Sequence, residues 1–218
     1  MTLDKTQMAR FVYVGQGGPL SVIPLKSLLE TGITPEAVLV PRPARHPRNL
    51  NLLPVKPARN EASLATIASD MGLPLISWQK GYDAEIEADL RDIAPDLVIM
   101  SCFPWRITER LLAIPDLGWW NLHPSLLPAY RGPNPLHWQL EAGEAVTGIS
   151  LHEVEPELDT GPLLGQVRCD LTVAMEIETR LAQLGATLVI EALQRQQRGT
   201  LVATPQDEAL ASYQSFPV

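Results

Sequence analysis

Short apolar runs alternate with amphipathic segments along the amino-terminal half of the chain. The apolar runs are typical of β-strands, and the one at residues 95–101 (PDLVIMS) carries a continuous apolar stretch, as in a strand buried on both faces. The predicted strands are residues 10–15, 36–41, 73–78, 95–101 and 118–123. The segments between them carry apolar residues at helical spacing, which predicts helices over 19–32, 60–72, 83–94 and 108–114.

The carboxyl-terminal part of the chain follows a different pattern. After Asn121 we expect a helix, two strands separated by a loop, a long helix and an extended tail, at 134–143, 147–154, 161–171, 175–199 and 204–218. Strands that alternate with helices form a parallel sheet, because the crossover helices cover its faces. We therefore predict an α/β fold with a mostly parallel twisted sheet and helices on both faces. No Pro/Gly/Ser-rich linker divides the chain, which favours a single domain over residues 1–218.

Local signals mark the ends of one helix and the position of one loop. Asn60 is the expected N-terminal cap of the helix at 60–72, and Gly72 is its expected stop. Residues 41–57 are rich in proline and basic side chains, which predicts an irregular surface loop. The tryptophans that we expect in the core, rather than against a ligand, are Trp119, Trp120 and Trp138.

Composition narrows the classes of function. The chain is 45% hydrophobic and 19% charged, as in ordinary globular proteins, and its net charge is −8. Domains that bind nucleic acid usually present a basic face, so a nucleic-acid partner is not expected. No apolar run reaches the roughly 18 residues that suggest a membrane span, and the amino terminus lacks a secretion signal. Two cysteines, Cys102 and Cys169, are too few for a disulfide framework or zinc site, so we expect small buried residues in a cytoplasmic protein without a metal.

A glycine-rich turn follows the first predicted strand. Gly15, Gln16 and Gly17 stand where a strand-to-helix turn can hold a phosphate or the edge of a substrate. The dinucleotide fingerprint needs a further glycine at position 20, which is Leu20. The alternative is a tight turn that requires a positive φ, and the sequence leaves both interpretations open.

Asn121 and His123 end the fifth predicted strand. Residues two apart on a strand share a face, so both side chains point to one side of the sheet, at the carboxyl edge where ligands bind in open α/β folds. An amide can donate to an oxyanion and an imidazole can transfer a proton near neutral pH. The alternative is a turn cap beside a hydrogen-bonded histidine.

Two further groups could join this pair. Asp159 lies in a loop before Gly161, and as a partner of His123 its carboxylate would fix the orientation of the imidazole and raise its pKa. Aspartic proteases share Asp-Thr-Gly but need two such segments, and this chain offers one. Ser150 and His152 form another same-face pair, or else an ordinary half-buried strand position. No serine has the surroundings of a nucleophile elbow.

The segment from Asn121 to Gln166 contains Asn-x-His, Ser-Leu-Leu-Pro, Thr-Gly, Ser-x-His and Leu-Asp-x-Gly-Pro in that order. This order and spacing resembles the signature of the folate-dependent formyltransferases, which include glycinamide ribonucleotide transformylase and methionyl-tRNA formyltransferase. The resemblance extends more weakly to Gly15 and to residues 204–213, TPQDEALASY. It implies a Rossmann-like formyltransferase domain in which 10-formyltetrahydrofolate donates a formyl group to an amine.

The resemblance also implies roles for individual residues. It places the catalytic trio on Asn121, His123 and Asp159. Asn121 would donate to the oxyanion of a tetrahedral intermediate, protonated His123 would assist electrostatically, and Asp159 would orient His123 and support proton transfer. The residues expected around the folate are Phe103, Trp105, Arg106, Ile107, Glu153, Glu157 and Leu158. The residues expected around the acceptor are Gly15, Gln16, Gly17, Ser125, Tyr130, Arg131, Ser150 and His152.

Two segments bear on the acceptor. The purine-pathway members carry a different loop where this chain reads GQGGPLS, and residues 130–135 (YRGPNP) are closer to the tRNA and amino-sugar formyltransferases. The acidic charge and a chain that stops at Val218, with no C-terminal tRNA-binding domain, favour a small-molecule amine. The alternatives are methionyl-tRNA formylation without that domain, hydrolysis of the folate to release formate, and a non-catalytic folate- or nucleotide-binding domain. A homodimer is left open.

Overall fold

The structure is a computed structural model that describes residues 8–42, 63–171 and 176–216. Within these ranges every strand and helix predicted from the sequence is present. The strands are β1 Phe11–Gly15, β2 Ala37–Arg42, β3 Leu75–Gln79, β4 Leu97–Ser101, β5 Trp119–His123, β6 Val146–Glu153 and β7 Leu163–Asp170. The helices are α1 Pro19–Glu30, α2 Leu64–Asp70, α3 Asp83–Ile93, α4 Glu109–Leu112, α5 Pro135–Glu141 and α6 Ile177–Gln197, with a 3-10 turn at Glu208–Leu210.

The described strands form one sheet in the order β3-β2-β1-β4-β5-β6-β7. The first five are parallel, whereas β6 runs antiparallel to β5 and β7 runs antiparallel to β6. The predicted mostly parallel α/β sheet is therefore confirmed. The strand order reverses between β1 and β4, and in open α/β sheets ligands bind at the carboxyl ends of the strands beside such a point. Gly15 and Ser101 pair there, with β5 as the next strand.

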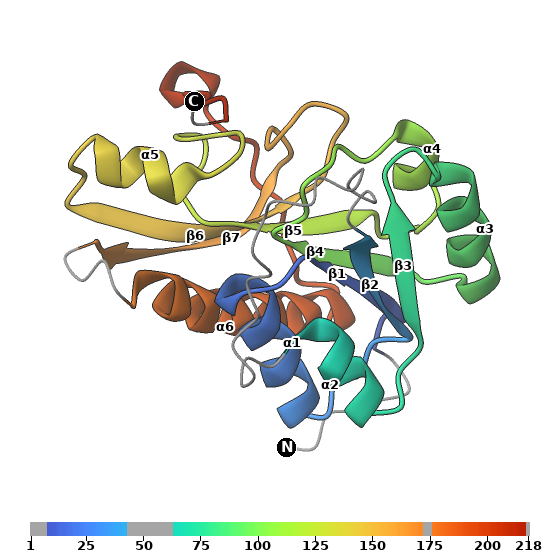
Figure 1. The fold of residues 1–218 in the computed structure, drawn as a ribbon. Helices are drawn as coiled ribbons and strands as arrows, with labels where there is room; N and C mark the ends of the chain where they lie inside the picture. The colour runs from blue at the N-terminus through green and yellow to red at the C-terminus, as the bar shows by residue number, and fades with distance from the viewer. Residues whose placement is uncertain (1–7, 43–62, 172–175, 217–218) are drawn as a thin grey trace, which may run out of the picture.

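Two apolar cores pack against the sheet, and Figure 1 shows helices on both of its faces. Helices α1, α2 and α6 cover one face, where Trp120 and Leu122 of β5 are buried. Helices α3 and α4 cover part of the other face, where Trp119 is buried. Because side chains alternate along a strand, Asn121 and His123 lie on the same face as Trp119. Over β6 and β7 this face carries α5 and the carboxyl-terminal segment instead (Figure 1).

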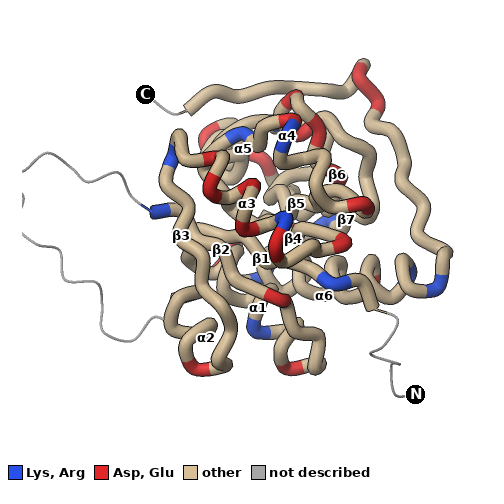
Figure 2. Tube along the Cα trace, turned by 90° about the vertical axis from the view of Figure 1, so that its right-hand side faces the viewer, with Lys and Arg blue, Asp and Glu red and all other residues tan. Residues whose placement is uncertain are grey.

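The carboxyl-terminal segment, defined here as residues 200–216, crosses the molecule after α6. It first pairs with the beginning of β7 through a bridge between Thr204 and Leu163, and later with the chain after β5 through a bridge between Tyr213 and Arg131. Figure 2 shows this segment rising from the end of α6 and passing over the top of the molecule. It therefore links two loops that are far apart in the sequence.

Of three local expectations, one is wrong, one lies mostly outside the described residues and one is confirmed. Ser63, not Asn60, caps α2, because its hydroxyl accepts a hydrogen bond of 3.1 Å from the Thr66 N–H. Asn60 lies outside the described residues, and so does most of the predicted loop at 41–57, although its first two residues belong to β2. Gly72 follows α2 with a φ of 64°, as expected of a helix stop.

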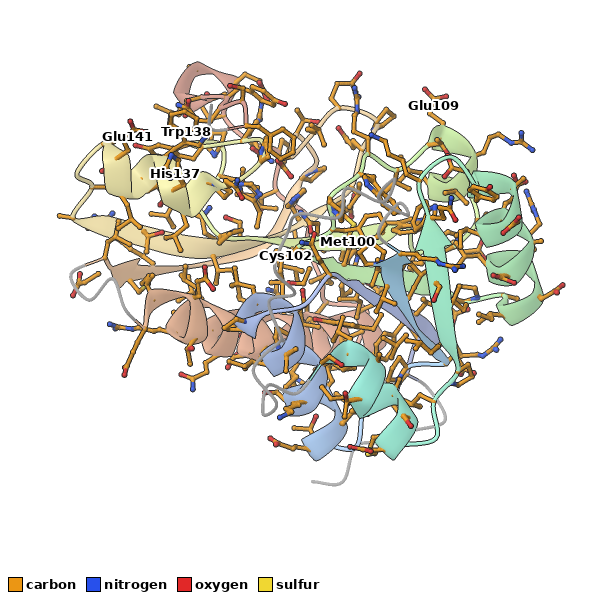
Figure 3. The ribbon with its side chains drawn as sticks, viewed as in Figure 1. Met100, Cys102, Glu109, His137, Trp138 and Glu141 are labelled. Carbon is orange, nitrogen blue, oxygen red and sulfur yellow. The ribbon has the colours of Figure 1, made fainter. Side chains whose placement is uncertain are left out.

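The tryptophans do not all lie in the core. Trp119 and Trp120 are buried, as predicted, but the prediction for Trp138 is wrong. Its indole N–H donates to the Ser215 carbonyl over 2.9 Å, so Trp138 lies between α5 and the carboxyl-terminal segment (Figure 3). Trp138 is only partly buried. Cys169 is buried as expected, whereas Cys102 is only partly buried.

None of the helices in the described part of the chain is both long and apolar enough to cross a membrane. Figure 2 shows that lysine and arginine are interspersed with aspartate and glutamate along the described trace.

Candidate active site

The pairing of β5 with β6 brings polar side chains together on one face of the sheet. Asn121 lies opposite His152, and His123 lies opposite Ser150. Directly opposed residues of an antiparallel pair point to the same face, so all four side chains project toward the side covered by α5 and the carboxyl-terminal segment. All four residues are buried, which is unusual for polar side chains and requires that each finds a partner.

A chain of hydrogen bonds orients the Asn121 amide. The Nδ1 atom of His152 lies 2.6 Å from the carbonyl oxygen of Glu153, so it carries a proton and donates it. The Asn121 Nδ2 can only donate, and it lies 3.1 Å from the His152 Nε2, which therefore accepts this hydrogen bond. This bond uses one of the two N–H groups of the amide, so the second can serve a ligand.

His123 lies between a backbone carbonyl and a carboxylate. Its Nε2 is 2.9 Å from the Tyr130 carbonyl, which can only accept, so Nε2 carries a proton. Its Nδ1 is 3.5 Å from Oδ1 of Asp159. The structure therefore brings the predicted pair of His123 and Asp159 together, with Nδ1 as the atom that can take up a proton.

Asp159 approaches both histidines from the loop between β6 and β7. Its Oδ1 is also 3.6 Å from Nε2 of His152, and its Oδ2 accepts a hydrogen bond of 2.8 Å from the Gly132 N–H. Asp159 has a φ of 58°, a left-handed conformation that non-glycine residues seldom adopt. Gly132 has a φ of 98°, and a Cβ atom there would lie 2.2 Å from the Gln214 carbonyl, so this position requires glycine.

Burial and charge set the protonation of the pair. Burial and the neighbouring His152 lower the pKa of His123, although Asp159 and the Tyr130 carbonyl raise it. The expected effect of Asp159 is thus present, but burial outweighs it. Burial raises the pKa of Asp159, yet His123, His152 and the Gly132 N–H hold that pKa well below its usual range. At neutral pH, Asp159 is therefore ionised and His123 is neutral.

A cleft of about 350 Å³ lies beside the Asp159 loop. Its lining includes Leu158 and Thr160, the neighbours of Asp159 on either side, together with Arg106. The side chain of Arg106 donates to the Pro156 carbonyl, three residues before Asp159. The full set of lining residues is Arg106, Arg131, Glu157, Leu158, Thr160, Ala211, Ser212 and Tyr213.

The residues predicted around the folate lie in different places. Arg106, Glu157 and Leu158 line the cleft. Phe103 and Trp105 pack on Trp78 instead, with ring centroids 4.8 and 5.9 Å from it. The remaining two are Ile107, which is buried in the core beside α3 and α4, and Glu153, whose pKa is raised mainly by burial.

The residues predicted around the acceptor occupy several places. Gly15–Gly17 lie at the carboxyl edge of the sheet, and none of the hydrogen bonds found among the described residues joins Gln16 or Gly17 to Asn121, His123 or Asp159. The Tyr130 phenol donates to Glu144 over 2.5 Å, so its backbone rather than its ring serves the cluster. This bond raises the pKa of Tyr130 to about 12.

Ser125 and Ser150 lie beneath the cluster, and both are fully buried. The Ser150 hydroxyl donates to the Ser125 carbonyl over 2.7 Å and accepts hydrogen bonds from the Leu127 N–H and the Gln166 amide. The Ser125 hydroxyl donates to the Ala129 carbonyl over 2.7 Å. These bonds hold the turn that follows β5, which carries the Tyr130 carbonyl to His123.

Arg131 contacts the carboxyl-terminal segment. Its guanidinium donates to Oε1 of Gln206 and forms a 2.6 Å ion pair with Glu208. Gln206, Glu208 and Gly132 were not predicted as site residues from the sequence. Gly132 belongs to the Tyr-Arg-Gly motif, and Gln206 and Glu208 belong to the TPQDEALASY tail. From the sequence, the motif was used only to predict the acceptor, and the tail only to extend the family resemblance.

A metal centre is not indicated in the described part of the chain, where no group of three or more His, Cys, Asp or Glu side chains could hold an ion. The cluster is a set of hydrogen-bonded acids, bases and donors beside a cleft. Such a set can bind a carbonyl oxygen and move a proton.

The sequence matches a known protein family and resembles several known enzymes. The family model described as formyl transferase matches residues 49–195. Methionyl-tRNA formyltransferase from Chloroflexus aggregans is 35% identical over 208 residues, which cover 93% of this chain and 64% of that protein. The protein of the same name from Geobacter metallireducens is 39% identical over 152 residues, 67% of this chain and 48% of that protein. The chain thus spans about half to two thirds of the length of these relatives.

Solved structures share the fold at lower identity. Glycinamide ribonucleotide transformylase 1 from Symbiobacterium toebii superposes with a TM-score of 0.73 at 20% identity, covering 95% of this chain and 99% of that one. An N-formyltransferase from Helicobacter canadensis, crystallised with folinic acid and dTDP-3-aminofucose, gives a TM-score of 0.70 at 21% identity and covers 96% of this chain and 71% of that one.

Proposed function

The chain belongs to the formyl transferase family, and we propose that it transfers a formyl group from 10-formyltetrahydrofolate to an amine. The observation that carries this proposal is the cluster of Asn121, His123 and Asp159 beside the cleft, in which Asn121 and His123 are buried and Asp159 is partly buried. The cluster combines an amide donor, a neutral base and an ionised carboxylate, which are the groups that this reaction needs.

Asn121 supplies the oxyanion donor. Attack of an amine on a formyl carbon turns the carbonyl oxygen into an oxyanion, and an N–H that already points at that position stabilises it without reorganisation. His152 holds one N–H of the Asn121 amide, which fixes the rotation of the amide and directs the second N–H. Asn121 is 8% exposed and His152 is 1% exposed, so a ligand meets Asn121 rather than His152.

His123 and Asp159 receive the proton that the amine must lose. The neutral His123 has its free lone pair on Nδ1, 3.5 Å from the Asp159 carboxylate. When Nδ1 accepts the proton, the resulting imidazolium is paired with Asp159 and donates to the Tyr130 carbonyl through Nε2. The positive charge then assists the oxyanion electrostatically, as expected of a protonated His123. When the intermediate collapses, the bond between the formyl carbon and the donor nitrogen would break, and the His123 imidazolium would return its proton to that leaving nitrogen.

The cleft fits a ligand with polar edges. Arg106 offers donors, the Thr160 hydroxyl offers an acceptor because its hydrogen is donated within its own loop, Leu158 offers an apolar wall, and Glu157 offers a further acceptor. We propose that Arg106, Glu157 and Leu158 hold the folate, which brings the formyl group when bound. The backbone of the Glu157–Gly161 loop would supply the remaining polar contacts.

A small-molecule amine is the proposed acceptor. The net charge is −8, and of the two arginines that line the described cleft, Arg131 is already paired with Glu208. A nucleic-acid backbone requires several cations, which this cleft does not supply. The second candidate is the amino group of methionyl-tRNA, which the curated relatives at 35–39% identity favour.

The test is incubation with 10-formyltetrahydrofolate and a panel of amines, followed by mass spectrometry of the acceptors. The panel contains nucleotide-linked amino sugars, free amino acids and methionyl-tRNA. Addition of a formyl group to a small amine supports the proposal, and addition only to methionyl-tRNA replaces the proposed acceptor by the second candidate. Release of formate without any amine would indicate a hydrolase instead. Absence of folate binding in calorimetry would contradict both the transferase and the hydrolase.

A further inference from the structure

The carboxyl-terminal segment contacts the loops on both sides of the candidate active site. Gln206 contributes most of this contact. Its Nε2 donates to the Asp159 carbonyl over 2.8 Å and to the Gly161 carbonyl over 2.7 Å. Its Oε1 accepts from Nε and Nη2 of Arg131 over 3.2 and 2.9 Å. The amide thus uses both of its hydrogens and its oxygen in one place.

We propose that Gln206 is a positioning residue, which holds the backbone of Asp159 so that its carboxylate reaches His123. This proposal rests on the proposed function. Gln206 does not touch the reacting groups. It acts through the loop that carries Asp159, and Arg131 acts as its anchor. Glu208 completes the anchor, because both of its carboxylate oxygens accept hydrogen bonds from the Arg131 guanidinium.

The need for such a residue follows from the loop itself. Asp159 has a φ of 58°, which costs free energy unless surrounding contacts hold it. Gly132 restrains the carboxylate by its N–H, and the backbone carbonyls of Asp159 and Gly161 are restrained by Gln206. The loop is therefore fixed from two sides, and removal of one side allows the His123–Asp159 distance of 3.5 Å to change.

Arg131 then anchors Gln206 instead of binding the substrate. Its side chain is only 8% exposed, and its donors point to Gln206 and Glu208. Its backbone is held as well, because its N–H donates to the Ser212 carbonyl and its carbonyl accepts from the Gln214 N–H, over 2.9 and 2.8 Å. Arg131 thus fastens the carboxyl-terminal segment beside the Tyr130 carbonyl and the Gly132 N–H, which bind His123 and Asp159.

The test compares three variants of the full chain. Gln206→Ala removes all four hydrogen bonds. Gln206→Glu has nearly the same shape and retains an acceptor for Arg131, but an ionised carboxylate cannot donate to the Asp159 and Gly161 carbonyls. Gln214→Ala is the matched control, because Gln214 lies on the same segment and only its backbone N–H is bonded to Arg131.

We expect both Gln206 variants to lower kcat about tenfold, the size typical of losing one or two hydrogen bonds, with Gln214→Ala unchanged. Hydrogen exchange of the amides at Arg131 and Thr204 should stay protected in Gln206→Glu, which shows that the segment is still docked. The effect on kcat should also disappear in an Asp159→Asn background, because Gln206 acts through Asp159. Wild-type kcat in Gln206→Glu, or additive losses with Asp159→Asn, would overturn the proposal.

A second measurement needs no activity. Because Asp159 raises the pKa of His123, Gln206→Ala should lower the pKa of the His123 imidazole in an NMR titration of the ligand-free protein. If the wild type transfers no formyl group, the proposed function fails, and this titration decides the positioning role alone. An unchanged His123 pKa in Gln206→Ala would overturn it.

Discussion

Two parts of the molecule hold the two halves of the candidate active site in different ways. The antiparallel ladder between β5 and β6 fixes the spacing of Asn121, His123 and His152. Asp159 stands on a loop, where the Gly132 N–H and the side chain of Gln206 hold it. The strand half depends on backbone pairing, which tolerates many substitutions. The loop half depends on the Gln206 side chain and on the position of the Gly132 N–H, so a single substitution at either residue can disturb it.

This difference matters for the chemistry. The donor and the base must occupy fixed places relative to a ligand, and strands provide rigid positions. The carboxylate sets the charge around His123, and a small movement of the loop changes its effect. We therefore expect variants of the strand half to change the rate most, and variants of the loop half to change its pH dependence.

The largest effect is expected from loss of the strand-borne donor and base. Asn121→Ala and His123→Ala should each lower kcat by about a hundredfold to a thousandfold, the cost typical of losing one oxyanion donor or a proton acceptor. The fold should persist, because the ladder between β5 and β6 is made by the backbone. Circular dichroism and steady-state kinetics test this.

His137→Ala is the matched control for the histidine variant. His137 lies on α5, where its side chain is 51% exposed, and among the described residues its imidazole nitrogens are paired only with Glu141 (Figure 3). Its replacement should leave kcat unchanged. Near-normal turnover in both Asn121→Ala and His123→Ala would contradict the mechanism.

An intermediate effect, of about tenfold to a hundredfold on kcat, is expected from Asp159→Asn, since the paired charge is lost while the shape is kept. Asp159 raises the pKa of His123, so its neutralisation should lower that pKa further. His123 accepts a proton only when neutral, so kcat/KM falls as pH drops through its pKa, below 6.5. The acidic limb of the pH profile should therefore move to lower pH in Asp159→Asn. A limb at the wild-type position would show that Asp159 does not face His123 during the reaction.

The smallest effect on catalysis is expected from Ser150→Ala, beneath the strand half. The variant removes the acceptor of the Leu127 N–H and of the Gln166 amide, which costs about 1–3 kcal/mol of unfolding free energy. Thermal denaturation should show a Tm lower by several degrees, at about 2–4 °C per kcal/mol. KM for the acceptor should stay the same if Ser150 supports the turn. A changed KM with an unchanged Tm would instead support the substrate-binding role predicted from the sequence.

Much of the fold could be predicted from the sequence, because each buried strand needs an apolar run and each covering helix needs an apolar stripe. Every predicted strand and helix in the described part is present, with shifted ends. The α2 cap shows where local signals fail. Asn60 and Ser63 are both good caps, and the choice depends on where Leu64 meets the core. The spacing of Asn121 and His123 predicted a common face, because strand alternation is local.

The sequence by itself determined the alternation of strands and helices, the shared face of Asn121 and His123, and the chemical identity of each candidate group. Only the tertiary structure decided that His152 orients Asn121, that burial lowers the pKa of His123, and that Gln206 holds the Asp159 loop. The physical reason is the separation along the chain of the residues that interact. Strand periodicity acts between neighbours in the chain, whereas burial and hydrogen bonds between residues 159 and 206 exist only after the carboxyl-terminal segment has crossed the sheet.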